Sequence, residues 1–189
     1  MNIFLIGYRC SGKTSVGKSL AKKLGLSFFD TDSELVKEQG MNIFEIVSKQ
    51  GWNIFREMEK AVIKRSCAFD DYVVATGGGA VLDIENVRHM KKSGVLVWLK
   101  ATPETIKKRI SQDKNTKDFR PALTSKGFVE EIEGTLLSRN QYYDNAMDFY
   151  IDADSIGIDE VCNAIVKKLS VCNVAIFSMG GLLLLKYTS

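Results

Sequence analysis

The most informative chemical pattern lies near the amino terminus, where GxxxxGK[ST] is complete over Gly7–Thr14. It follows the apolar run Ile3–Ile6 and opens a segment of helical periodicity, which is the context in which this pattern binds phosphates. Glycine lets backbone N–H groups turn toward phosphate oxygens, and the positive end of the following helix strengthens the attraction. Lys13 is expected to reach the β- and γ-phosphates of a nucleotide, and Thr14 to offer its hydroxyl to Mg²⁺. The nucleotide site is expected to include Gly7, Arg9, Cys10, Ser11, Gly12, Lys13, Thr14 and Ser15.

An acidic motif, Asp30-Thr31-Asp32, follows a second short apolar run. In extended chain, two residues separated by one neighbour face the same way, so the two carboxylates would point to one site. One carboxylate can hold Mg²⁺ and the other can orient a substrate hydroxyl. We assign the metal to Asp30, together with Thr14, and the hydroxyl to Asp32. The alternative is that Thr31 or Asp32 caps a helix beginning at Ser33.

Two further patterns could bind a small anion. Arg56 and Glu59 are three residues apart and would be neighbours on a helix, so Glu59 could hold the guanidinium while its fork faces a carboxylate. The alternative is an ordinary surface ion pair. Gly77-Gly78-Gly79 follows the apolar run Tyr72–Ala75 and could bring backbone N–H groups close to a ligand, or it could simply form a tight turn.

The elements that must position these motifs are short buried strands alternating with helices. Continuous apolar runs predict strands that are buried on both faces of a parallel sheet, at Ile3–Ile6, Phe28-Phe29, Tyr72–Ala75, Val95–Leu99 and Phe149–Ile151. Helices are predicted where apolar residues recur every four positions, at Val16, Leu20 and Leu24 before Gly25, and at Val161, Ile165 and Leu169. A further helix should begin at Thr102-Pro103-Glu104. Alternating strands and helices indicate an α/β protein with a parallel sheet.

Composition limits the remaining possibilities. The 189 residues suit one domain, and 45% hydrophobic with 26% charged residues is typical of soluble globular proteins. The net charge of +3 gives no support to a nucleic-acid partner. The cysteines, Cys10, Cys67, Cys162 and Cys172, are widely spaced and there is one histidine, so no zinc site is expected. Lys13 follows the short apolar start, so we expect no signal peptide and a cytoplasmic location.

Other nucleotide-binding classes fit less well. The segment 115–118 only approximates the Asn-Lys-x-Asp guanine reader of GTPases, and it lies in a polar segment rather than after a strand. No acid ends the run Tyr72–Ala75, where an AAA-type ATPase would have one. The acid that serves the metal must therefore come from elsewhere, and Asp30 supplies it.

The motifs, taken in order, resemble the shikimate kinase family over residues 1–170. They are the glycine-rich loop, Asp-Thr-Asp, Phe-Arg-x-x-Glu, Thr-Gly-Gly-Gly, Arg120-Pro121 in a polar segment, and Arg139 in a late helix. The resemblance implies a three-layer α/β/α fold of the nucleoside-monophosphate-kinase type with a five-stranded parallel sheet. It also implies roles for the matching residues: shikimate would be held by Asp32, Arg56, Gly77, Gly78, Gly79 and Arg139.

Within that site, the resemblance implies that Arg56 and Arg139 clamp the carboxylate of shikimate and that Asp32 contacts its ring hydroxyls. Arg120 would sit on a closing lid and touch the transferred phosphoryl group, and Arg109 would lie near the adenine of ATP. The implied reaction is transfer of the γ-phosphate of ATP to the 3-hydroxyl of shikimate with Mg²⁺. Lys13, Asp32 and Arg120 would carry the catalysis.

Two different interpretations remain open. One is another small-molecule kinase of the same fold, such as a gluconate kinase. The other is a binding protein that has kept the fold without catalysis, against which the intact Lys13, Thr14, Asp30, Asp32 and Arg120 argue. No nucleic-acid or membrane partner is expected in any of these cases.

Two segments stand apart from the rest of the chain. Residues 111–125 are polar, with little apolar periodicity, and are predicted to form a mobile loop. Residues 171–189 turn apolar again, but their apolar stretch is shorter than the ~20 residues that a membrane span needs. We expect a monomer, with the tail as an extra buried element, a self-association surface or an artefact of the gene's 3′ end.

Overall fold

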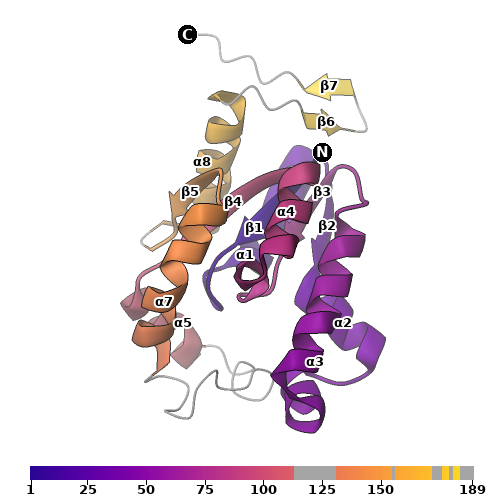
Figure 1. Ribbon diagram of the computed structural model, residues 1–189. Coiled ribbons are helices and arrows are strands. Elements are labelled where there is room, and N and C mark those ends of the chain that lie inside the picture. The colour runs from indigo at the N-terminus through magenta and orange to yellow at the C-terminus, as the bar shows by residue number, and fades with distance from the viewer. Residues whose placement is uncertain (113–130, 155, 172–175, 179–180, 184–189) are drawn as a thin grey trace.

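The computed structural model describes residues 1–112, 131–154, 156–171, 176–178 and 181–183. Its centre is a sheet of five parallel strands in the order β2-β3-β1-β4-β5 (Figure 1). The strands are β1 (Asn2–Ile6), β2 (Ser27–Asp30), β3 (Tyr72–Ala75), β4 (Gly94–Lys100) and β5 (Phe149–Asp152). All five strands predicted from apolar runs are confirmed, with bounds that differ by one residue at most.

β1 occupies the middle of the sheet, and helices cover both of its faces. It pairs with β3 on one side and β4 on the other, so that Ile3 lies beside Val73 and Val95. Every residue of β1 is buried. A strand that is covered on both faces has no polar side, which explains why Ile3–Ile6 is a continuous apolar run rather than an alternating pattern.

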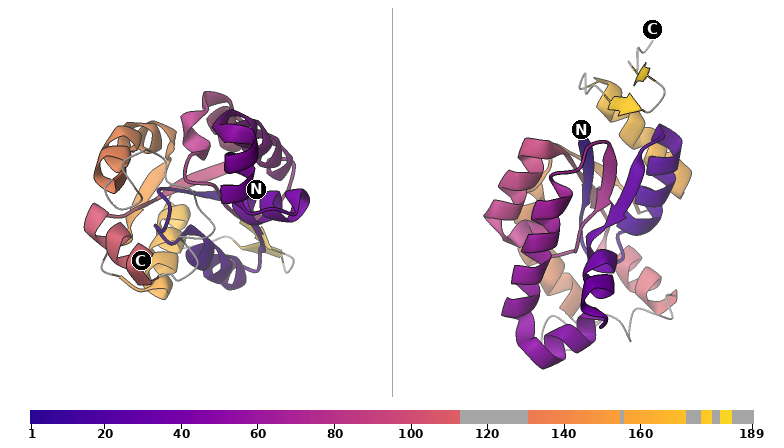
Figure 2. Two further views of the ribbon diagram at one scale, coloured as in Figure 1. Left: turned by 90° about the horizontal axis from the view of Figure 1, so that it is seen from below. Right: turned by 90° about the vertical axis from the view of Figure 1, so that its right-hand side faces the viewer.

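The helices form one layer on each face of the sheet, which confirms the predicted three-layer α/β/α fold (Figures 1 and 2). Helices α1 (Lys13–Leu24) and α8 (Ile158–Val171) pack on one face through a core cluster that includes Leu20 and Ile165. The other face is covered by α3 (Ile43–Ser66), α4 (Ile84–Ser93) and α7 (Glu131–Ala146).

Three shorter helical elements extend these layers. Helix α2 (Thr31–Gln39) packs on α3, and α5 (Pro103–Gln112) packs on α7. The 3₁₀ turn η1 (Ala80–Leu82) follows the glycines after β3 and contacts both α4 and α7.

Helix boundaries follow the expected signals in two cases. Gly25 ends α1 in the left-handed conformation at φ 67°, which favours glycine. The Thr102 hydroxyl accepts a hydrogen bond from the backbone N–H of Thr105 over 3.3 Å, so it caps α5 as predicted.

The helix that follows β2 does not begin at the residue that the sequence indicated. Helix α2 begins at Thr31, not at Ser33, and its cap is Asp30, whose carboxylate accepts from the backbone N–H of Ser33 over 3.0 Å. Asp32 therefore lies inside the first helical turn, and the premise of an extended Asp30–Asp32 segment does not hold. Asp30 keeps the extended backbone of the strand and still caps the helix. The sequence alone therefore did not distinguish an extended Asp30–Asp32 segment from a helix that begins at Thr31.

Residues beyond α8 add a separate element. Strands β6 (Ile176–Ser178) and β7 (Gly181–Leu183) pair antiparallel in a two-stranded sheet of their own. In Figures 1 and 2 this hairpin lies beyond the carboxyl end of α8, at the amino-terminal edge of the large sheet. The expected loop at 111–125 begins within α5, and its residues 113–125, with Arg120, lie outside the described residues.

Candidate active site

The glycine-rich segment Gly7–Thr14, here called the phosphate loop, joins the carboxyl end of β1 to α1. Its path requires left-handed backbone at Gly7 (φ 141°), Gly12 (φ 103°) and Cys10 (φ 59°). A Cβ atom on Gly7 would lie 2.7 Å from the carbonyl oxygen of Leu99, so no larger residue fits there. The cysteine shows that the loop tolerates a small side chain at one left-handed position.

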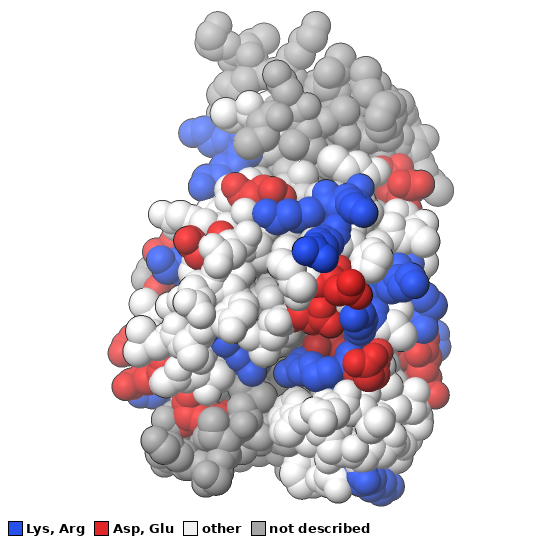
Figure 3. Space-filling view, viewed as in Figure 1, with Lys and Arg blue, Asp and Glu red and all other residues white. Residues whose placement is uncertain are grey.

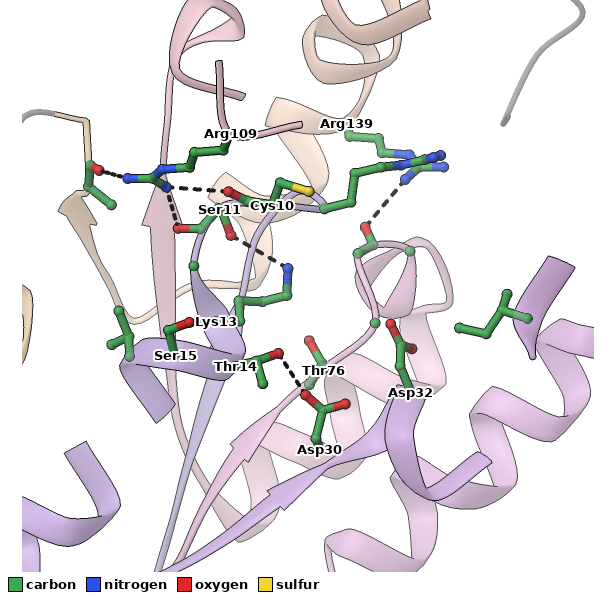
Figure 4. Close-up of a pocket in the computed structure, with 18 of the residues that line it drawn as sticks. Cys10, Ser11, Lys13, Thr14, Ser15, Asp30, Asp32, Thr76, Arg109 and Arg139 are labelled. Atoms are coloured by element: carbon green, nitrogen blue, oxygen red, sulfur yellow. Dashed lines mark hydrogen bonds between the residues drawn. The ribbon is translucent and has the colours of Figure 1, made fainter. Parts of the chain in front are cut away.

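Lys13, the first residue of α1, folds back over this loop. Its Nζ donates to the carbonyl oxygens of Gly7 over 2.8 Å and Tyr8 over 2.7 Å. The side chain is 8% exposed, so its ammonium group is held at the centre of the loop. Figure 4 shows it directed toward Ser11, where a bound phosphate chain would need positive charge.

Thr14 faces the end of β2. Its hydroxyl donates to the Asp30 carboxylate over 2.8 Å, and this places a hydroxyl and a carboxylate side by side next to the phosphate loop (Figure 4). Both groups offer hard oxygen atoms of the type that Mg²⁺ prefers.

A cavity of about 410 Å³ opens at the carboxyl edge of the sheet, above these groups. In folds of this kind, ligands bind outside the carboxyl ends of the strands. The cavity is lined by the phosphate loop, by the residues after β2, by α3 and by Gly77–Gly79, here called the glycine turn. Its cationic lining residues are Arg9, Lys13, Arg56, Arg109 and Arg139, against the carboxylates of Asp30, Asp32 and Glu59. An anion would be attracted to this cavity.

The outer face shown in Figure 3 carries charges of both signs. On the face shown in Figure 3, blue and red side chains are interspersed. Charged residues outside the cavity also pair with each other: Lys60 contacts Asp83 and Glu85, and Arg65 contacts Glu38.

Arg109 ties two sides of the cavity together. From α5 its guanidinium donates to the carbonyl oxygens of Ser11 over 2.9 Å and Cys10 over 3.3 Å. It also donates to the carbonyl oxygen of Ala153 over 2.5 Å, in the segment between β5 and α8. The phosphate loop and this segment are therefore held at a fixed separation.

Arg56 and Glu59 form the predicted ion pair inside the cavity. The Arg56 Nη1 to Glu59 Oε2 distance is 2.5 Å, and Glu59 is only 2% exposed. Burial raises the pKa of Glu59 to about 6, partly offset by the charge of Arg56 and increased by the nearby charge of Asp32. The Arg56 guanidinium also lies over the rings of Trp52 and Phe55, at 5.3 and 5.2 Å from their centroids. These contacts fix its direction.

The glycine turn approaches these side chains so closely that a larger residue at Gly77 or Gly79 would displace them. A Cβ atom on Gly79 would collide with the guanidinium of Arg56, and one on Gly77 would collide with the carboxylate of Glu59 and lie 2.7 Å from that of Asp32. On the other side of the turn, Arg139 of α7 donates to the carbonyl oxygen of Gly78 over 3.4 Å. The guanidinium groups of Arg56 and Arg139 therefore meet at neighbouring residues of one turn, with the Asp32 carboxylate beside it. Figure 4 shows Arg139 and Asp32 next to this turn.

A family model described as shikimate kinase matches residues 9–170 of this chain. The chain belongs to the shikimate kinase family. The shikimate kinase of Thermodesulfovibrio yellowstonii is 42% identical over 167 residues, which cover 88% of this chain and 94% of that protein. These findings confirm the family and the ATP-dependent kinase activity that the motifs predicted, and the gluconate kinase alternative is not better supported.

Solved structures agree with the fold. A shikimate kinase from Acinetobacter baumannii, in complex with shikimate, has a TM-score of 0.83 at 28% identity and covers 92% of this chain and 94% of its own. One from Aquifex aeolicus has a TM-score of 0.78 at 32% identity, with 92% and 99% covered. The part of the chain that the structure describes contains no helix long and apolar enough to cross a membrane.

Nearly all residues that the sequence singled out meet in this shikimate kinase cavity. Arg9, Cys10, Ser11, Gly12, Lys13, Thr14, Ser15, Asp30, Asp32, Arg56, Gly77, Gly78, Gly79, Arg109 and Arg139 all line it. Gly7 is not among the lining residues, because it forms the start of the turn and packs against Leu99. Arg120 lies outside the described residues.

Several lining residues were not predicted. Trp52 and Phe55 form an apolar wall beside Arg56, while Ala153, Ile156, Ile158 and Val161 form another at the far end, near Arg109. Their apolar types gave no signal of a ligand, because such residues usually belong to a core. The one signal available from the sequence was position, since Ile156 and Ile158 follow the predicted strand Phe149–Ile151 on the side where ligands bind in such sheets.

Proposed function

We propose that this protein transfers the γ-phosphate of ATP to the 3-hydroxyl of shikimate, giving ADP and shikimate 3-phosphate. The observation that carries the proposal is the joining, in one cavity, of the phosphate loop with Arg56 and Arg139 at the glycine turn. Shikimate is a ring with one carboxylate and vicinal hydroxyls. Two guanidinium groups match the carboxylate, and the carboxylate of Asp32 matches a hydroxyl.

ATP would occupy the half of the cavity that contains the phosphate loop and Arg109. The apolar residues Ile156 and Ile158, which line this cavity together with Arg109, offer apolar contacts for adenine. The triphosphate would then run along the loop toward Lys13, whose ammonium would exchange its carbonyl partners for β- and γ-phosphate oxygens.

Mg²⁺ fits the pair of Thr14 and Asp30. Because the Thr14 hydroxyl donates its proton to Asp30, its lone pairs remain available to a cation. Among the described residues no group of three or more His, Cys, Asp or Glu could hold a metal alone, so phosphate oxygens and water would complete the shell. When bound, Mg²⁺ would neutralise charge on the β- and γ-phosphates.

Asp32 is the proposed catalytic base. It lines the cavity next to Gly77, where it can orient the attacking hydroxyl and accept its proton as the new O–P bond forms. The bond between the γ-phosphorus and the β–γ bridging oxygen breaks in the same step, and Lys13 stabilises the charge that ADP gains. We assign Arg120 to the transferred phosphoryl group on the family resemblance alone.

We propose that the protein works as a monomer, because one chain supplies the whole described cavity. A separate proposal is that it is located in the cytoplasm. The test is to incubate the protein with Mg²⁺, ATP and shikimate and to identify the product by mass and by ³¹P NMR. A phosphate monoester at the 3-hydroxyl, formed in proportion to ADP, is expected. ADP release without a phosphorylated acid would mean that water is the acceptor and would overturn the proposal.

A further inference from the structure

We propose that Tyr143 is a positioning residue for the acid substrate, because its buried hydroxyl holds the Gly78–Gly79 peptide and the guanidinium of Arg139 in one arrangement. The inference rests on the proposed function and adds a residue to it. Tyr143 carries no charge, lies on α7 and does not line the cavity, so no motif singled it out.

The contact itself is short and shared. The Tyr143 hydroxyl donates to the carbonyl oxygen of Gly78 over 2.6 Å, and Arg139 Nη1 donates to the same oxygen over the longer distance of 3.4 Å. Arg139 precedes Tyr143 by four residues, so both side chains leave the same face of α7. The tyrosine therefore makes the stronger of the two links between this helix and the glycine turn.

The hydroxyl is held rigidly. Tyr143 is completely buried, and its ring stacks on that of Trp98 in β4, with centroids 5.5 Å apart and an interplanar angle of 23°. Burial also raises the pKa of Tyr143, so the hydroxyl keeps its proton and remains a donor at neutral pH. A fixed ring on a central strand thus carries a fixed donor to the turn.

The rest of the glycine turn is already pinned, which leaves the peptide between Gly78 and Gly79 as the part that Tyr143 controls. The N–H of Gly77 donates to the Thr31 hydroxyl over 3.0 Å, and the carbonyl of Gly79 accepts from Leu82 over 3.0 Å. In a planar trans peptide the C=O and the following N–H point in opposite directions. Holding the Gly78 carbonyl toward α7 therefore aims the N–H of Gly79 away from α7.

This orientation matters for the substrate because Gly79 touches Arg56 and Gly78 touches Arg139. A rotation of the peptide would turn an acceptor carbonyl toward the side from which a carboxylate approaches, and it would release Arg139 from its anchor. Gly78 also packs against the phosphate loop, where a Cβ atom on it would lie 3.0 Å from the backbone nitrogen of Arg9. We infer that Tyr143 tunes the affinity for the acid more strongly than the affinity for the nucleotide. Lys13 and Arg109 fix the phosphate loop independently.

The test is Tyr143→Phe, which keeps the ring and its stacking but removes the hydroxyl. The KM for shikimate should rise about tenfold, equivalent to about 1.4 kcal/mol, with the KM for ATP within about twofold and kcat within about threefold of the parent. Tyr142→Phe is the matched control, because this neighbouring tyrosine of α7 is 41% exposed and outside the cavity. It should leave all three constants unchanged.

If Tyr143 had a merely structural role, Tyr143→Phe would lower the melting temperature and would change the KM values for shikimate and ATP equally or not at all. Equal changes in the two KM values, or no change in either, would overturn the inference. If Tyr143→Phe does not fold, Trp98→Phe replaces it, since this change leaves the hydroxyl present but loosens the ring that carries it. A selective rise in the KM for shikimate again supports the inference, and parallel or absent changes overturn it. A parent protein without shikimate turnover would instead overturn the proposed function, together with the inference that rests on it.

Discussion

The hydroxyl of Thr14 and the carboxylate of Asp30 lie 2.8 Å apart, joined by a hydrogen bond from the first turn of α1 to the end of β2. The same carboxylate caps α2 through its second oxygen. One aspartate therefore fixes the start of a helix and stands next to the phosphate loop. The proposed metal site is in this way tied to two helix ends, which should keep its geometry constant as substrates enter and leave.

Asp30→Asn should weaken the use of Mg²⁺ and leave the fold intact, since asparagine is an equally good helix cap. Loss of a partner in a metal's surroundings typically costs about 10–100-fold in affinity or activity. We expect the Mg²⁺ concentration for half-maximal rate to rise within that range, with the KM for shikimate nearly unchanged. Titration of activity with MgCl₂ at fixed ATP measures this.

The control for that change is Asp83→Asn, which alters the aspartate that caps α4 and has no place in the cavity. It should reproduce any small effect on thermal stability without changing the Mg²⁺ requirement. An unaltered Mg²⁺ requirement in Asp30→Asn would remove this residue from the metal site.

Lys13→Ala tests the phosphate loop. Its ammonium is the charged group held at the centre of the loop, and loss of such an electrostatic contact typically costs at least about a hundredfold in kcat. Lys18→Ala, on the exposed side of the same helix, serves as the control. Near-normal kcat in Lys13→Ala would exclude the loop from the mechanism.

Arg56 and Asp32 should separate binding of the acid from the chemical step. Arg56→Ala should mainly raise the KM for shikimate, because a partner of the carboxylate is lost, while ATP affinity stays close to normal. Asp32→Asn should mainly lower kcat, because the attacking hydroxyl loses its base. Steady-state kinetics with both substrates varied gives these constants. Equal damage to ATP binding in both variants would contradict a separate pocket for the acid.

The buried Glu59 predicts a pH dependence. Its pKa is raised to about 6, first by burial, with Arg56 opposing the shift and Asp32 adding to it. As pH falls through about 6, Glu59 gains a proton and its hold on Arg56 weakens, so the KM for shikimate should rise, by at most about tenfold per pH unit. Shikimate itself should stay ionised there, since carboxyl groups titrate near about pH 4.

The effect on stability has the opposite sign. Because the folded-state pKa lies above the ordinary value of 4.5, the contribution of Glu59 to folding is fully present below that value and is lost as pH rises through about 6. Glu59→Gln should remove most of the pH dependence of the KM for shikimate and of stability. Glu57→Gln, on the exposed side of α3, should leave both unchanged. A KM profile that is identical in the parent and in Glu59→Gln would assign the pH dependence to another group.

Residues 172–189 should be dispensable for catalysis. Helix α8 ends at Val171, at the edge of the sheet opposite the cavity, and the family model ends at residue 170. A chain ending at Val171 should have kcat and both KM values within a few-fold of the full chain. The apolar composition of the segment predicts a change in melting temperature or in oligomer mass by light scattering. A truncated protein that folds but has lost activity would show that the segment reaches the site.

The sheet and most of the site could be predicted from the sequence, because both depend on local patterns. Buried parallel strands are continuous apolar runs, and the phosphate loop carries its own glycine spacing. The several roles of Asp30 were harder to predict, since one residue can end a strand, cap a helix and lie at a proposed metal site at the same time. Tyr143 could not be predicted, because its importance comes from a contact with Gly78, 65 residues earlier in the chain. No local sequence pattern around Tyr143 or Gly78 indicates that the two residues are in contact.

The central claim is that a hydroxylated ring carboxylate is the phosphate acceptor, and a coupled ADP-release assay over a panel of hydroxy acids tests it most directly. The panel contains shikimate, quinate, gluconate and glycerate, each with Mg²⁺ and ATP, and the blank without acid measures hydrolysis by water. With Arg56 and Arg139 at one glycine turn, the account predicts that shikimate gives the highest kcat/KM and that Arg56→Ala removes most of this preference. Turnover of gluconate with none of shikimate would contradict it.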